Sequence, residues 1–180
     1  MKKISRTLGV FLLATLCHAN DPLDWLEKET ARQLKGSRVL SDSGVVLHTP
    51  DGIGHYKALW TRDLYYMMHY APGFIDSNEE KASIEYLLAG QREDGCIPDR
   101  VNAEGLAIYS PGGVNNPLAD HAVDNGPFLA LSVCEYVVRN KDYKFFRKIE
   151  PAIKRGLEHI RKSKNGLVYN PPEEPQCVYG

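Results

Sequence analysis

The residues best suited to recognise a sugar are Trp60-Thr61-Arg62-Asp63, which stand directly before a strongly apolar run. Thr61 is a favourable helix N-cap, and Asp63 then falls in the first turn, where the helix dipole favours a carboxylate. A flat indole face, guanidinium donors and carboxylate acceptors together suit a polyhydroxylated ligand. We therefore expect Trp60, Arg62 and Asp63 to bind substrate. The alternative is that Asp63 only caps the helix, Arg62 pairs with it and Trp60 is a core residue.

Two further polar pairs are candidates for the same site. Asp124 and Asn125 precede Gly126-Pro127 at the entrance of an apolar segment, so a helix N-terminus would point them towards a pocket. Their alternative role is helix capping, for which Asp and Asn are favoured. Asp99 and Arg100 lie in a long connection, 92–120, and we expect them to form part of a pocket wall, because binding residues are frequent on such loops.

Residues 1–19 have the three parts of a secretory signal peptide. Lys2, Lys3 and Arg6 precede a short apolar core, and Ala19 provides a small residue for cleavage before Asn20. The apolar run is too short to span a bilayer. We therefore expect residues 20–180 to be secreted or periplasmic, with no membrane attachment after the signal is removed.

Charge and cysteine content exclude several other classes of partner. Without its signal the chain has 19 Lys and Arg against 23 Asp and Glu, a formal charge of −4, which gives no footprint for nucleic acid. Cys96, Cys134 and Cys177 are widely spaced, with no C-x-x-C pair and no histidine cluster in the sequence around them. This spacing argues against a zinc site, so the sequence predicts no metal and no cofactor. An oxidising compartment would allow one disulfide, and the sequence leaves its partners open.

The elements predicted to carry these residues are mainly helices. Apolar periodicity and capping residues predict helices over 22–35, 61–70, 77–91 and 128–138, and a fifth from 142 to about 160, with a short hairpin at 38–48. Inner apolar helices alternate with outer amphipathic ones, and no β–α–β pattern is present. The predicted fold class is therefore all-α, made of helical hairpins with short β-hairpins in the loops.

Three motifs in this order resemble the six-hairpin glycosidase superfamily, whose glucoamylase-like members are (α/α)6 toroids. They are Trp60-Thr61-Arg62-Asp63, the loop Arg92–Pro98, and Asp124-Asn125-Gly126-Pro127. The resemblance implies that 20–180 is the N-terminal part of such a domain, acting on an oligo- or polysaccharide from its non-reducing end. A full toroid needs roughly 350 residues, so a missing C-terminal half or a second subunit is expected.

The resemblance also implies two catalytic carboxyl groups. It assigns the general acid to the loop around 170–176, where Glu173 or Glu174 is the candidate. The flanking prolines favour an exposed acidic turn for these two residues, and the alternative position for the acid is beyond Gly180. No residue is a candidate for the base. Two alternatives therefore remain open: a toroid lyase or epimerase, which uses a Tyr, His or Arg base, and a non-catalytic carbohydrate-binding protein.

Overall fold

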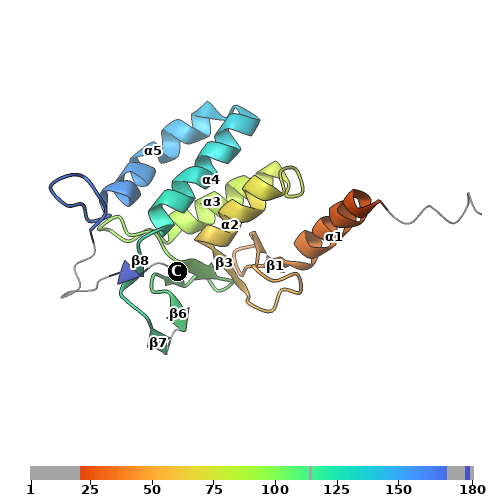
Figure 1. The fold of residues 1–180 in the computed structure, drawn as a ribbon, viewed down its shortest axis with the longest axis horizontal. Helices are drawn as coiled ribbons and strands as arrows, with labels where there is room; N and C mark the ends of the chain where they lie inside the picture. Colours follow the sequence, from red (N-terminus) through yellow and green to blue (C-terminus); the bar gives the residue numbers. More distant parts are fainter. Residues whose placement is uncertain (1–20, 114, 170–176, 179–180) are drawn as a thin grey trace, which may run out of the picture.

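The computed structural model describes residues 21–113, 115–169 and 177–178, and within them the fold is mixed α and β (Figure 1). These residues form five helices and nine short strands, so the all-α expectation is wrong. Most of the strands outside the predicted loop hairpins escaped detection because each has only two or three residues, whereas an alternating apolar pattern needs about four to eight. The helices are α1 (Pro22–Gly36), α2 (Thr61–Tyr70), α3 (Ser77–Ala89), α4 (Asn125–Asn140) and α5 (Tyr143–Glu158).

The strands form four small sheets. Antiparallel pairing joins β1 to β2, β3 to β4 to β5, and β6 to β7, while β8 and β9 pair in parallel. The strands are β1 (Arg38–Leu40), β2 (Val46–His48), β3 (Ala58–Trp60), β4 (Arg100–Asn102), β5 (Ala107–Ile108), β6 (Gly112–Gly113), β7 (Asn116–Pro117), β8 (His121–Ala122) and β9 (Cys177–Val178). The β1–β2 pair confirms the hairpin predicted at 38–48, with Gly44 at a φ of +82° in its turn.

Four of the helices pack together around one core. Helix α4 packs against α2, α3 and α5, as its nearly all-round apolar sequence predicts, and α1 lies at the edge of the molecule (Figure 1). The most completely buried core side chains come from both helices and strands: Leu47, Leu59, Leu64, Met68, Ile84, Leu87 and Leu129. Figure 1 shows the strands gathered at the end of this group where α2 and α4 begin. The candidate site residues therefore sit where sheet meets helix N-termini.

The junction between β3 and α2 differs from the sequence prediction. Trp60, not Thr61, occupies the N-cap position, and it makes no side-chain capping bond. Thr61 is fully buried, its N–H donates to the Asp99 carbonyl at 2.9 Å, and its hydroxyl donates to the Pro98 carbonyl at 2.7 Å. Thr61 therefore fixes α2 to the segment before β4 and is not available as a cap.

The other helix starts follow ordinary capping chemistry. Asp21 accepts a hydrogen bond from the Leu23 N–H, and Asp142 accepts one from the Phe145 N–H. Asp76 caps α3 by accepting a hydrogen bond from the Asn78 N–H. None of the five helices is both long and apolar enough to cross a membrane.

Candidate functional site

Two arginine–aspartate pairs lie at the sheet–helix junction. Arg62, in the first turn of α2, donates to Asp124 Oδ2 at 3.0 Å, and both side chains remain partly exposed. Arg100, in β4, donates to Asp99 Oδ2 at 2.7 Å, and these two side chains are only 9% and 6% exposed. The structure thus brings together four predicted site residues from three separate segments.

The two arginine–aspartate pairs interact electrostatically. The pKa of Asp99 is raised, mainly because the side chain is buried. The hydrogen bond from Arg100 and the positive charges of Arg100 and Arg62 lower this pKa, whereas the negative charge of Asp124 raises it. Opposite charges alternate through the cluster, so each carboxylate faces a guanidinium. Asp124 Oδ1 is buried and has no hydrogen-bond partner among the described residues. Since a buried carboxylate oxygen normally finds a donor, this atom is an unsatisfied acceptor within the cluster.

Trp60 forms the aromatic border of the cluster. Its β3 position is directly opposite Arg100 in the β3–β4 register, and the Arg100 guanidinium carbon lies 5.2 Å from the centre of its ring system. Tyr56 meets the indole edge-on at 5.3 Å between centroids. These two contacts hold the ring orientation, and Arg100 is further fixed by donating to the Gly112 carbonyl at 2.9 Å. Trp60 is therefore a rigid, partly exposed apolar surface.

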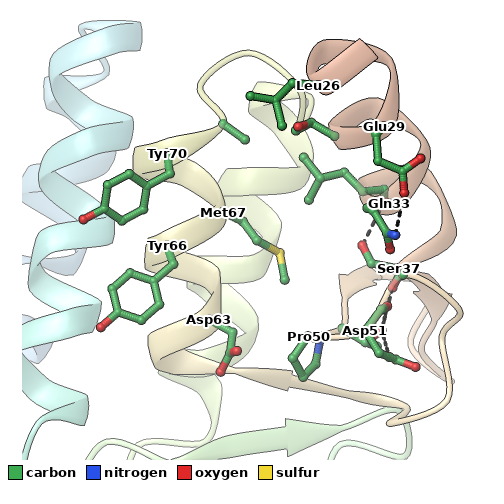
Figure 2. Close-up of a pocket in the computed structure, with 15 residues that line it drawn as sticks. Leu26, Glu29, Gln33, Ser37, Pro50, Asp51, Asp63, Tyr66, Met67 and Tyr70 are labelled. Carbon is green, nitrogen blue, oxygen red and sulfur yellow. Dashed lines mark hydrogen bonds between the residues drawn. The ribbon is translucent and has the colours of Figure 1, made fainter. Parts of the chain in front are cut away.

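Asp63 faces a separate, neighbouring cavity of about 570 Å³ between α1 and α2. Figure 2 shows Asp63 and Met67 on the side of α2 that faces α1, with Pro50 and Asp51 at the base of the cavity. Burial raises the pKa of the Asp63 carboxyl, and the positive charge of Arg62 only partly opposes it. The cavity wall combines a half-buried carboxylate with apolar and amide groups, which is the composition expected of a small-ligand site.

Several cavity residues had no signal in the sequence. Glu29 and Gln33 reach the cavity from α1, Asp51 from the loop after β2, and Met67 from α2 (Figure 2). The amphipathic pattern of α1 marks which face is apolar, but it does not say which other element that face meets. Only the tertiary arrangement of α1 beside α2 creates this wall.

One predicted residue does not join the site, and two others fall outside the part of the chain that the structure describes. Asn125 is 2% exposed, and its amide donates to the Ile97 carbonyl at 3.3 Å, so it connects α4 to the 92–99 segment. Glu173 and Glu174, the candidates for the general acid, lie outside the described residues. Among the described residues, therefore, the substrate-binding candidates can be placed and the catalytic candidates cannot.

A third group lies beside these residues and was missed by the sequence. Cys96, His121 and His159 each place one ligand atom within 4.8 Å of the others. No histidine lies near Cys96 in the sequence, but two histidines lie close to it in three dimensions. Burial raises the pKa of the Cys96 thiol to about 12, so the metal-free residue is a thiol at neutral pH. A coordinated metal would reverse this, since a coordinating thiol is deprotonated.

Comparison with known proteins provides no relative for this chain. No family model matches it, no curated protein is detectably similar in sequence, and no solved structure is detectably similar in fold.

Proposed function

We propose that the chain binds the non-reducing end of a carbohydrate in the manner of a glycoside hydrolase. The observation that carries this proposal is the position of Arg62 and Asp63 at the start of α2. Asp63 faces the cavity between α1 and α2, and Arg62 faces the charged cluster with Asp124. A sugar ring stacked near Trp60 would present hydroxyl groups to both sides. Carboxylates accept from such hydroxyls, and guanidinium groups donate to them.

Hydrolysis needs more than this binding surface. Glycosidases use two carboxyl groups about 5–5.5 Å apart for retention, or about 6.5–9.5 Å apart for inversion. Asp63 is the half-buried carboxylate with a raised pKa that lines the cavity, and such an environment suits either an acid role or tight hydroxyl binding. A second carboxyl group from the 170–176 segment would complete a hydrolase. Without one, the same surface describes a carbohydrate-binding protein.

The test is binding and turnover on a panel of oligosaccharides, using wild type, Asp63→Asn and Arg62→Lys. We expect each variant to weaken binding about 10- to 100-fold, because a hydrogen bond to a charged group contributes about 1.5–3 kcal/mol. Asp24→Asn is the matched control, since Asp24 is an exposed α1 carboxylate that pairs with Lys28 outside the cavity.

The products separate the kinds of activity. Release of a reducing sugar from the non-reducing end supports a hydrolase, whereas an unsaturated product absorbing in the ultraviolet indicates a lyase. Binding without turnover supports the carbohydrate-binding role. Equal affinity of wild type and both site variants for every glycan in the panel contradicts the proposal.

A further inference from the structure

Three segments far apart in the sequence meet at Cys96, His121 and His159. Cys96 follows the turn after α3, His121 opens β8, and His159 is the C-cap residue of α5. Their ligand atoms lie within 4.8 Å of one another, and the two imidazole rings lie 4.9 Å apart at an interplanar angle of 62°. None of the carbohydrate-site contacts described above uses these three side chains.

His159 carries an unsatisfied nitrogen in this group. Its Nδ1 lies 3.2 Å from the Asp94 carbonyl oxygen, which can only accept, so Nδ1 must carry the proton. Nε2 is then an unprotonated acceptor, and it is buried without a hydrogen-bond partner among the described residues. Leaving a buried polar atom unpaired costs about 1–3 kcal/mol, so such an atom calls for a partner.

His121 has the same tautomer for a similar reason. Its Nδ1 lies 3.0 Å from Asp120 Oδ2, and a carboxylate accepts from that nitrogen, which leaves Nε2 with its lone pair. A histidine whose other nitrogen donates to a carboxylate or a backbone carbonyl is the usual arrangement around a protein-bound metal. Both histidines therefore have the outer contacts that orient metal ligands.

The loop that carries Cys96 is held firmly against the end of α5. Gly95 has a φ of +97°, and a Cβ there would lie 2.5 Å from the Arg155 carbonyl oxygen, so only glycine permits this approach. Arg92 donates to Asp94 at 2.7 Å and lies 3.6 Å from Asp120. Arg92 thus orders both acidic residues that stand behind the two histidines.

We propose that Cys96, His121 and His159 form a zinc site with three protein ligands and a fourth position for water or another ligand. One thiolate and two imidazoles are ligands preferred by zinc, whereas calcium and magnesium prefer oxygen. In a tetrahedral zinc site the ligand atoms are about 3.3–3.7 Å apart, given Zn–N near 2.0–2.1 Å and Zn–S near 2.3 Å. The three ligand atoms lie within 4.8 Å of one another, so the most separated pair has to approach by at most about 1.5 Å.

The position of this site indicates a structural connection to the carbohydrate-binding residues. Three residues after Cys96 the chain reaches Asp99, and three residues after His121 it reaches Asp124. A zinc ion would therefore fix the two segments that carry these carboxylates. The zinc proposal itself does not depend on what the neighbouring site binds.

The experiment uses untagged, chelator-treated protein titrated with zinc against a chromophoric competitor, and with cobalt(II) monitored by absorbance. We expect one zinc per chain, a thiolate-to-cobalt charge-transfer band, and a higher melting temperature with zinc. Cys96→Ser should remove the charge-transfer band and, like His121→Gln, weaken zinc binding about 100-fold or more. Asp120→Asn should weaken it about 10- to 100-fold through His121.

Matched controls keep the test decisive. Cys134→Ser removes an exposed thiol, and His69→Gln removes a histidine that pairs with Glu135, so both should bind zinc as the wild type does. Because Cys96 is buried and its variant can fail to fold, His121→Gln with native circular dichroism is the second variant. Absence of zinc uptake by folded wild type, or unchanged zinc affinity in His121→Gln, overturns the proposal.

Discussion

At the scale of single residues, the surroundings of Asp63 disfavour its charged form. Burial raises the pKa of its carboxyl, and the nearby Arg62 charge is directed to Asp124 rather than to Asp63. A carboxylate kept in such a place destabilises the fold at neutral pH. Natural proteins tolerate strain of this kind mainly where it serves binding or catalysis.

We predict that Asp63→Asn makes the protein more stable at neutral pH, by about 0.5–1 kcal/mol. Because the folded-state pKa is raised, the folded protein binds this proton more tightly than the unfolded chain does. Stability from Asp63 is therefore highest in acid and falls as pH rises from its ordinary value of 3.8 through the raised value. The gain in Asp63→Asn should vanish towards low pH in denaturant titrations. A loss of stability at every pH would instead show that Asp63 stabilises the start of α2.

At the scale of elements, the helices were the predictable part. Their bounds follow apolar periodicity and capping residues, and the cap prediction failed at Thr61, where a distant carbonyl, that of Pro98, takes the hydroxyl. The pairing of β3 with β4 was not predictable, because residues 58–60 pair with the distant residues 100–102 and neither segment is long enough to show alternation. The candidate site was also predictable only in part. The site residues at helix starts could be recognised in the sequence, whereas the cavity wall that α1 contributes could not.

His48 shows how one buried side chain joins elements. It ends β2 with 2% exposure, and its Nε2 lies 3.0 Å from Glu79 in the first turn of α3, while its Nδ1 lies 3.3 Å from the Ser37 hydroxyl. Burial lowers the pKa of His48, the Glu79 hydrogen bond and charge raise it, and the Arg38 charge lowers it. The net effect is a lowered pKa of the His48 imidazole, so its protonation is less favourable in the folded protein than in the unfolded chain.

We predict that this histidine makes the hairpin sensitive to acid. Below the ordinary pKa of 6.5, His48 is protonated in the unfolded chain before it is protonated in the folded protein. The free energy of unfolding therefore falls by at most about 1.4 kcal/mol per pH unit until the lowered pKa is reached. His48→Gln should flatten the unfolding free energy between about pH 7 and pH 5. His55→Gln, at an exposed loop position, is the control and should keep the wild-type slope. An unchanged slope in His48→Gln would assign the acid sensitivity to other groups.

At the scale of the whole molecule, the position of α1 matters most. It contributes one wall of the cavity that Asp63 faces, and its N-cap, Asp21, lies just after the predicted cleavage point before Asn20. Processing at that point would leave α1 and its cap intact. The exported protein would therefore retain the α1 wall of the cavity.

We predict that the chain expressed in a bacterium with a Sec pathway is exported and that its mature N-terminus is Asn20. N-terminal sequencing and intact mass of the extracytoplasmic fraction provide the measurement. Cys17→Ser should give the same mature protein, because Leu16 disfavours acylation of that cysteine. Retention of residues 1–19 in the cytoplasm would contradict the export prediction.

The fixed orientation of Trp60 has an optical consequence. The chain has two tryptophans, and the other, Trp25, is 58% exposed on α1. Replacing Trp25 by phenylalanine therefore leaves a single indole between Tyr56 and the Arg100 guanidinium. Its emission would report directly on any molecule that displaces water from that ring. The protein thus contains an internal fluorophore at the border of its own candidate site, so ligand screening needs no added dye.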